Sequence, residues 1–417
     1  MRSVLLPLVL LFSPIAGGSS WPSHRTAAPC DEGNGGLTLE PGFCAVVVAK
    51  DLEGVRQVTA GGEGTVYAAL ARGDAGVVAL RDTNGDGRAD ERATFGPSGA
   101  NDVKLHDGHL YLALADRVVR WKLAAGQLSP AGEPEVVVSG LPADRSHRAK
   151  SIAFEGDAMF VNIGAPSNSC QEKDRTRGSP GVDPCPELAD RGGVWRFSAS
   201  RTGQQQAAGA RYATGIRNST ALAVRPGTKQ LYGGTHGRDQ LSTNWDFSDA
   251  YNAENPGEEL ILIDQGDDFG WPYCYYSTEV KSLVLAPEYG GNGKTLDRCA
   301  KMKEPVMVFP AHWAPLALAF SNGTALTGPW ADGVFVAFHG SWNRAPEPQA
   351  GYRVAFAPFV DGKPTGSFTT FAIGTESDTW LRATGVAVTR DGAVYISADK
   401  PGVIWKVVKA GGTKSGA

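Results

Sequence analysis

The residues best suited to acid–base chemistry gather around one histidine. His147 has Arg145, Arg148 and Lys150 as near neighbours in the sequence. Positive charges beside an imidazole favour its neutral form, which is the form that takes up a proton. Histidine is also the side chain best suited to accept a proton near neutral pH. His147 is therefore our candidate general base; the competing interpretation is a surface or hydrogen-bonded structural histidine.

Polar and aromatic residues recur at corresponding places further along the chain. Arg217 and Asn218 stand before a strand-like segment, as His147 does. A guanidinium and an amide there offer donors to carboxylate or quinone oxygens. The competing interpretation is a salt bridge between neighbouring sheets. Further members of the set are Trp313, His339, Arg344 and Arg382.

Two segments carry oxygen ligands at spacings that suit calcium. Residues 82–90 read DTNGDGRAD, so Asp82, Asn84 and Asp86 alternate before a glycine, a spacing that folds oxygens around a hard cation. The twelfth position lacks the usual glutamate, and a polar hairpin tip with Asx turns is an equally good interpretation. The second segment, the Gly/Pro turn at 254–259, could offer backbone carbonyls and one carboxylate. The alternative there is a solvated turn.

These candidates belong to a repeated pair of strands. The copy at His147 has a strand at 151–154, a turn containing Gly156 and a second strand at 159–163. Glycine supplies positive φ in such a turn, and β-branched and aromatic residues suit a pleated sheet. The same phrase begins at residues 57, 103, 151, 222, 318 and 386. Six copies, most of them followed by another strand, predict an all-β fold: a six-bladed β-propeller of four-stranded antiparallel blades. The strand at 43–49 is expected to complete the last blade beside 403–409.

The whole chain has 417 residues, 44 acidic and 40 basic side chains, and a formal charge of −4. With no basic run, nucleic acid is not an expected partner. Residues 1–18 are predicted to be a signal peptide, because the apolar run at 4–12 is too short to span a membrane comfortably. We expect a linker at 19–36, the propeller at 37–410 and a disordered tail at 411–417. We therefore expect a periplasmic or secreted protein without a stable membrane anchor.

Six cysteines agree with export. Sequence alone leaves fifteen connectivities, and a zinc site is a weak alternative because no CxxC pair is present. We favour pairing of sequential neighbours, since each pair brackets one loop. The predicted disulfides are Cys30–Cys44, Cys170–Cys185 and Cys274–Cys299.

The chain resembles the soluble quinoprotein sugar dehydrogenases, the glucose/sorbosone dehydrogenase family, over roughly residues 38–408. The motifs that carry the resemblance are Pro41-Gly42-Phe43, His147 ahead of 151–154, Gly215-Ile216-Arg217-Asn218, Glu258-Glu259-Leu260, Phe269-Gly270-Trp271-Pro272 and His339 to Arg344. The last is the form associated with the sorbosone and pyranose dehydrogenase branch.

This resemblance implies pyrroloquinoline quinone (PQQ) and a calcium ion in the central funnel. It implies that His147 takes the sugar hydroxyl proton and that Arg217 stabilises charge on the quinone. Asn218, Arg382 and Arg344 would contact the cofactor, and the turn with Ala253, Glu254 and Glu258 would hold calcium. His339 and Trp313 would complete the cofactor site. In the glucose-oxidising members an acid supports the histidine, whereas this chain has Ala165 there, which points away from glucose.

Two hypotheses about function follow. The first is a PQQ- and calcium-dependent dehydrogenase of a sugar such as an aldose, pyranose or sorbosone. Without a CxxCH motif, electrons would leave to a separate acceptor: a quinone, cytochrome or dye. The second is a non-catalytic exported propeller that binds glycan or protein and keeps the funnel as architecture. Binding of PQQ distinguishes the two.

Overall fold

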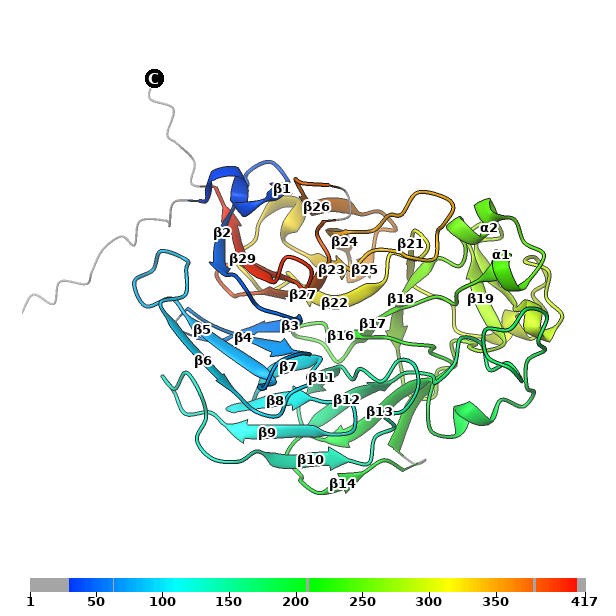
Figure 1. The fold of residues 1–417 in the computed structure, drawn as a ribbon, viewed down its shortest axis with the longest axis horizontal. Helices are drawn as coiled ribbons and strands as arrows, with labels where there is room; N and C mark the ends of the chain where they lie inside the picture. Colours follow the sequence, from blue (N-terminus) through cyan, green and yellow to red (C-terminus); the bar gives the residue numbers. More distant parts are fainter. Residues whose placement is uncertain (1–29, 63, 208–209, 378–379, 411–417) are drawn as a thin grey trace, which may run out of the picture.

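Six antiparallel sheets form a ring in the computed structural model, which describes residues 30–62, 64–207, 210–377 and 380–410 (Figure 1). The predicted signal peptide, the linker up to residue 29 and the tail 411–417 lie outside the described residues. Each blade has four main strands that pair one after another from the centre of the ring outwards. They follow the order of the sequence in five blades, and in the sixth the outermost strand comes from the N-terminal part of the chain. The predicted six-bladed propeller is therefore confirmed.

The first three blades follow one another along the chain. Blade 1 contains β3 (Val55–Ala60), β4 (Thr65–Leu70), β5 (Val77–Arg81) and β6 (Glu91–Phe95). Blade 2 contains β7 (Asp102–His106), β8 (His109–Ala113), β9 (Val118–Lys122) and β10 (Glu135–Ser139), with β14 (Gln204–Gln205) paired to β10. Blade 3 contains β11 (Ile152–Glu155), β12 (Ala158–Ile163), β13 (Gly193–Ser198) and β15 (Arg211–Thr214).

Blades 4 to 6 complete the ring. Blade 4 contains β16 (Ala221–Val224), β17 (Leu231–Thr235), β18 (Glu258–Ile263) and β21 (Met307–Phe309). Blade 5 contains β22 (Pro315–Phe320), β23 (Gly333–Phe338), β24 (Arg353–Val360) and β26 (Thr369–Gly374), with β25 (Lys363–Pro364) and β1 (Leu37–Leu39) added. Blade 6 contains β27 (Ala383–Val388), β28 (Val394–Ala398), β29 (Val403–Lys409) and β2 (Phe43–Ala49).

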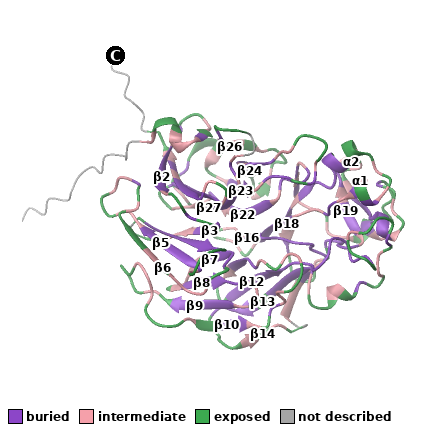
Figure 2. Ribbon diagram, viewed as in Figure 1, coloured by how far each residue is buried: buried purple, intermediate pink, exposed green. Residues whose placement is uncertain are grey.

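The core lies between the blades and along the second and third strands of each. Strands β4, β12 and β23 are buried at every position, and the interior strands are purple in Figure 2, while green is found mainly in loops and at the rim. Both faces of each inner strand pack against neighbouring blades, which explains the nearly continuous runs of Val, Ala, Leu and Phe. The first strands of adjacent blades contact one another around the centre.

The ring is closed by a strand from the N-terminal part of the chain. Strand β2 pairs antiparallel with β29, from Phe43 opposite Lys409 to Ala49 opposite Ile404. This confirms the pairing predicted for residues 43–49. The pairing also covers the edge of β29, which would otherwise present unpaired backbone groups to solvent.

All three predicted disulfides are present: Cys30–Cys44, Cys170–Cys185 and Cys274–Cys299. The first anchors residues 30–36, the described part of the predicted linker, to β2. The Val47 backbone N–H also donates to Asp31 Oδ2 at 2.8 Å. Residues 32–35 there form the short 3-10 helix η1 (Glu32–Gly35).

Long connections lie at the end of the ring where the first strands begin. They include residues 164–192 with η2 (Pro186–Ala189), and the segment after β17 with α1 (Leu241–Asn244) and α2 (Asp249–Glu254). The hairpin β19 (Cys274–Ser277) and β20 (Ser282–Leu285) stands beside α1 and α2 at the right of Figure 1. The remaining 3-10 helices are η4 (Pro287–Tyr289), η5 (Asp297–Lys301) and η6 (Gly328–Trp330). None of the described helices has both the length and the apolar character to span a bilayer.

Candidate functional site

A cavity of about 320 Å³ lies at the centre of the ring, at the end where the first strands begin. Its lining is rich in histidine and arginine, contributed by the starts of first strands and by the connections that follow second strands. The lining residues are Arg56, His147, Arg175, Arg217, His236, Gly237, Asp239, Glu258, His312, Ala314, Leu316, His339, Gly340, Trp342 and Asn343. We call this cavity the funnel.

A larger cavity of about 850 Å³ lies at the opposite end of the ring. It is lined by the turns between first and second strands, such as Gly61-Gly62 and Arg390-Asp391, and it contains no histidine. Volume alone would favour it, but the groups that can move protons and bind anions converge in the funnel. The funnel is therefore the candidate active site.

His147 is held in one tautomer by the backbone. Its Nδ1 lies 2.7 Å from the Ala165 carbonyl oxygen, and because a carbonyl only accepts, Nδ1 carries the proton. Burial, followed by the nearby Arg217 charge, lowers the pKa of His147 to about 3. The ring is then neutral at physiological pH, and Nε2 is left with its lone pair. The Ala165 backbone carbonyl is thus the hydrogen-bond acceptor that orients this imidazole.

Two features fix the backbone around His147. Its φ is +52°, a conformation that is costly for a residue with a side chain. The fully buried Lys150 donates from Nζ to the carbonyls of Pro142 and Arg148 at 2.8 Å each, on either side of this position. Directly after β12, a Cβ at Gly164 would lie 2.6 Å from His147 Cβ and 2.8 Å from Asn218 Oδ1. Only glycine leaves room for both side chains.

Two further histidines of the lining, like His147, donate a ring N–H to a backbone carbonyl. His236 Nε2 donates to the Pro315 carbonyl at 2.8 Å, and its Nδ1 accepts from Asn218 Nδ2 at 3.2 Å. Burial lowers the pKa of His236 to about 4. His312 Nε2 donates to the carbonyls of Asn252 and Asn255, and burial also lowers its pKa. The funnel wall therefore holds three neutral imidazoles.

Arg217 lies in a polar network on the funnel wall. Its guanidinium donates to Asn168 O and Oδ1 at 3.1 Å, to Gly237 O at 2.9 Å and to Asp239 Oδ2 at 2.9 Å. Arg175 reaches the same Asp239 oxygen at 2.9 Å. Burial by itself raises the pKa of Asp239, but the Arg217 and Arg175 charges outweigh burial, so the pKa is lowered overall. Asp239 is thus ionised and paired with two cations.

Glu258 is the buried acid without a cationic partner. Its oxygens accept the Gly237 N–H at 3.0 Å and the Ala314 N–H at 3.1 Å, and the described residues form no salt bridge with it. Burial raises the pKa of Glu258 to about 8, and the adjacent Glu259 is raised to about 8 in the same way. A carboxylate in this position is costly unless a proton or a cation neutralises it.

The opposite wall contains a second ionic group. Asp399 accepts from His339 Nε2 at 3.1 Å and from Arg56 Nη1 at 3.2 Å. Burial raises the pKa of Asp399, but the bond from His339 and the charges of Arg56 and Arg382 outweigh it, so the net pKa is lowered. Arg382 also stacks on the Tyr352 ring, with 5.5 Å from Cζ to the ring centroid.

The structure brings some predicted site residues together and separates others. His147, Arg217, Glu258 and His339 line the funnel, whereas Asn218 stands one layer behind, against Gly164 and His236. Trp313 packs in the core of blades 4 and 5, where Arg353 stacks on its ring at 4.5 Å.

The turn predicted to hold calcium is engaged by an arginine of the same chain. Arg344 Nη1 donates to the Ala253 carbonyl, and its Nη2 donates to Glu254 Oε1 at 2.6 Å. Neither Ala253 nor Glu254 is among the funnel residues. Of the three predicted ligands of this turn, Glu258 alone faces the funnel.

The segment 82–90 adopts the turn geometry of the polar hairpin interpretation. Asp82 accepts the N–H groups of Gly85 at 2.6 Å and Gly87 at 2.8 Å. Asn84 Oδ1 accepts the Asp86 N–H, and Asp86 Oδ1 accepts the Arg88 N–H, each at 2.8 Å. These are Asx-type bonds of the kind expected at a polar hairpin tip, and calcium binding by Asp82, Asn84 and Asp86 stays a prediction. The tip also attaches blade 1 to blade 6, because the Ala89 N–H donates to the Val48 carbonyl at 3.0 Å.

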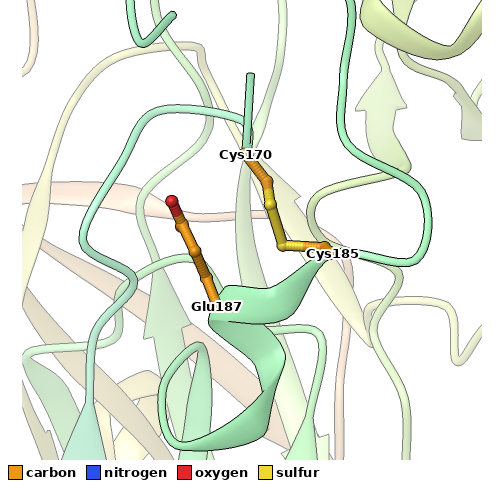
Figure 3. A group of neighbouring side chains, drawn as sticks. All are labelled: Cys170, Cys185 and Glu187. Atoms are coloured by element: carbon orange, nitrogen blue, oxygen red, sulfur yellow. A yellow bond between two sulfur atoms is a disulfide. The ribbon is translucent and has the colours of Figure 1, made fainter. Parts of the chain in front are cut away.

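One cluster outside the funnel has side chains of the types that bind metals. Cys170, Cys185 and Glu187 lie together at the start of η2, as Figure 3 shows. The two sulfurs form a disulfide, so no thiolate is available. Glu187 instead accepts from Ser167 Oγ at 2.7 Å. This cluster is structural.

Sequence reasoning missed several funnel residues. Arg175 and Asp239 come from long connections after β12 and β17, and Trp342 and Asn343 follow β23. Trp342 is 61% exposed at the rim, with Arg175 above its ring at 6.0 Å. For Asp239, Trp342 and Asn343 the available signal was positional, because these residues lie four or five positions after the second strand of a blade. Arg175 lies twelve positions after β12 and lacked that signal. Arg56, the second residue of β3, carried no such signal.

Fold and site together define the class: a six-bladed propeller with a polar, proton-transfer-competent funnel at its loop end. Residues 37–410 match the family model described as TrAA12-like, and the chain belongs to this family. A structure of the Trichoderma reesei carbohydrate-active enzyme family AA12 superposes with a TM-score of 0.74 at 17% identity, covering 90% of this chain and 98% of that one.

Other similarities point to the same group of proteins. The PQQ domain of a pyranose dehydrogenase from Coprinopsis cinerea superposes with a TM-score of 0.72 at 17% identity, covering 91% of this chain and 98% of that domain. The PQQ-dependent pyranose dehydrogenase of the same organism is 28% identical over 130 residues, which are 29% of this chain and 16% of that protein. The matched stretches span less than half of the curated relatives, 48% of one and 16% of another.

Proposed function

We propose that this protein is an exported, PQQ- and calcium-dependent dehydrogenase that oxidises a sugar, with His147 as the general base. The observation that carries the proposal is the neutral His147 imidazole. Its Nδ1–H is fixed on Ala165 O, which leaves Nε2 as an acceptor among three guanidinium groups. Membership of the TrAA12-like family and the PQQ-dependent relatives support it.

The proposed roles follow from the charges of the funnel. A sugar hydroxyl that donates to His147 Nε2 would lose its proton there, and a bound quinone would be the acceptor of the two electrons that leave the sugar. PQQ, when bound, supplies the electron-accepting quinone carbonyl. The Arg217 guanidinium supports the negative charge that develops on that acceptor, as preorganised donors do in a site shielded from water.

The funnel chemistry fits a cofactor with several carboxylates. Arg56, Arg175 and Arg217 line it, against Asp239 and Glu258, which leaves a net charge of +1 with both acids ionised. Arg382 lies close enough to Asp399 to lower its pKa and stands beside the same wall. Arginine recognises carboxylates in a bidentate manner, so these residues are the proposed cofactor contacts, with Asn218 and His339.

The fit to calcium rests on Glu258. This carboxyl is buried, faces the funnel and has no cationic partner among the described residues. Calcium prefers carboxylate and carbonyl oxygens, and an ion beside Glu258 would offset the cost of its burial. We therefore place the proposed calcium at Glu258 rather than at Ala253 and Glu254, whose oxygens contact Arg344. The three disulfides support export to the periplasm or the medium, with transfer of electrons to a separate acceptor.

A titration of the purified protein with PQQ, with and without calcium, tests the proposal. Absorbance of the cofactor is followed first during binding and then as aldoses, pyranoses and sorbosone are added. Tight, calcium-dependent binding followed by bleaching of the quinone on sugar addition is expected. Absence of PQQ binding would overturn the proposal and favour a non-catalytic glycan- or protein-binding propeller.

Two variants assign the roles. His147→Ala should abolish dye reduction while leaving PQQ uptake largely intact, because the imidazole acts on the substrate proton. Arg217→Ala should weaken cofactor retention and slow hydride transfer. Normal turnover in the first variant would remove His147 as the base, and an unchanged second variant would remove Arg217 from the site.

A further inference from the structure

A second cavity adjoins the funnel at the same end of the ring. It has a volume of about 550 Å³, and it is lined by loops of blades 1 to 3. Arg56 lines both cavities, so the two share a wall. The lining residues are Arg56, Ala71, Ser98, Gly99, Ala100, Asn101, Leu114, Ala115, Asp116, Arg117, Arg148 and Ala149. We call it the side cavity.

The side cavity is positively charged. Three guanidinium groups line it, from Arg56, Arg117 and Arg148, against one carboxylate, that of Asp116. Arg117 pairs with Asp116 at 2.8 and 3.0 Å, which neutralises one of the three. Arg56 pairs with Asp399, which lies outside the lining, so Arg148 contributes the one positive charge that no carboxylate of the described residues offsets.

Arg148 is the guanidinium best placed to receive a ligand. It is exposed, and no hydrogen bond, ion pair or ring contact involves its side chain within the described residues. It also follows the candidate base His147 directly in the chain, so it lies beside the point where funnel and side cavity meet. Arg56, by comparison, is already bonded to Asn101 Oδ1 at 3.3 Å and Asp399 at 3.2 Å.

We propose that the side cavity binds the carboxylate or sulfate of an acidic saccharide, with Arg148 and Arg117 as the anion-binding residues. The oxidised unit of that saccharide lies in the funnel at His147, and the neighbouring acidic unit lies in the side cavity. Guanidinium groups recognise both anions through paired N–H donors. The inference deepens the proposed function, on which it rests: it names an acidic saccharide as the substrate class.

Binding of three matched disaccharides tests the inference without turnover. Cellobiouronic acid, cellobiose and cellobiose 6′-sulfate differ in one substituent, and calorimetric titration of the full chain, with and without PQQ, gives their affinities. We expect the acidic compounds to bind at least about 10-fold tighter than cellobiose at low salt, since each forms a charge-assisted contact. The difference should shrink at high salt. The acidic compound that binds more tightly shows whether the side cavity prefers a carboxylate or a sulfate.

The variants Arg148→Gln and Arg117→Gln, singly and together, assign the residues. The preference for the acidic compound should be lost in the double variant, while affinity for cellobiose is retained. Arg72→Gln is the matched control, because Arg72 is an exposed arginine of the same face that lies outside both cavities. It should keep the preference.

Equal affinity of the wild-type protein for acidic and neutral compounds would overturn the inference, as would a preference that survives in the double variant. Binding of none of the three would overturn it too. The proposed function is tested separately, by PQQ binding and quinone reduction with neutral aldoses. A protein that reduces PQQ with neutral sugars but ignores the acidic group would keep the proposed function and refute the side cavity.

Discussion

His147→Asn should change how the stability of the protein depends on pH. The pKa of the His147 ring is about 3 in the folded chain because the ring is buried, against 6.5 for an unperturbed histidine. Between these values the unfolded chain binds the proton and the folded chain does not. The stability contributed by this ring is therefore complete above pH 6.5, and it is lost progressively as the pH falls towards 3.

The magnitude follows from these two pKa values. At pH 5 the protonated form of a histidine in the unfolded chain outnumbers the neutral form by about 30 to 1, and this protonation stabilises the unfolded chain by about 2 kcal/mol. At pH 7.5 the same contribution is close to zero. The unfolding free energy of the wild-type protein should therefore include a loss of about 2 kcal/mol between pH 7.5 and 5 that is due to His147 alone. His236 should contribute a similar loss, because its pKa is lowered to about 4.

Denaturant unfolding followed by tryptophan fluorescence, at pH 7.5 and pH 5.0, measures this loss. Glu258 and Glu259 titrate in the opposite sense, because their raised pKa values make stability fall as pH rises through 4.5 to 8. The informative quantity is thus the difference between the wild-type protein and the variant. Asparagine keeps an N–H that can donate to Ala165 O, and His109→Asn on the surface hairpin controls for the substitution itself. An identical pH dependence in wild type and His147→Asn would refute the argument from burial.

Three further perturbations are informative. Gly164→Ala should lower sugar oxidation by about 100-fold, because its Cβ would displace His147. Gly156→Ala is the control: a Cβ there meets nothing within 4 Å, so this variant should lose about 1 kcal/mol of stability and keep its turnover. Similar losses of turnover in both variants would contradict this prediction. Glu258→Gln should abolish the rise in Tm that calcium produces in the wild-type protein, because it removes the proposed ligand; an equal rise in both proteins would place the ion elsewhere. Lys150→Met should reduce kcat about 10-fold with PQQ affinity retained, because the backbone around His147 loses both of its clamping hydrogen bonds. A Lys150→Arg variant that restores kcat would support positioning, and unchanged kcat in the methionine variant would exclude it.

The blades could be predicted because their signal is local. Each copy combines a glycine turn with alternating apolar residues, and the strands formed where that pattern occurs, as at β11 and β12 around Gly156. Closure by β2 was predictable from topology, since a ring needs its last strand paired. The disulfides followed from the same locality, with each pair joining the two ends of one loop.

The funnel could be predicted only in part, because its other residues come from aperiodic connections. In the segment 312–315 both His312 and Ala314 have positive φ, +63° and +57°, so the chain turns His312 into the funnel and Trp313 into the core. No periodic pattern distinguishes these two neighbours. Arg344 is separated by one residue from Trp342, yet it turns away to the Ala253 carbonyl. Long-range packing of the loops decides such cases.

The pairing of β2 with β29 also determines where a linker, a tag or a fused domain would be attached to the propeller. Cys30 is bonded to Cys44 within β2, and the Ala410 N–H donates to the Gly42 carbonyl at 2.9 Å, so the described chain enters and leaves at the same blade. Strand β2 is the outermost strand of that blade, at the rim of the ring, whereas the funnel is lined from its centre (Figure 1). An electrode linker, an affinity tag or an electron-transfer module joined to either end would therefore hang from one point of the rim and leave the funnel mouth open.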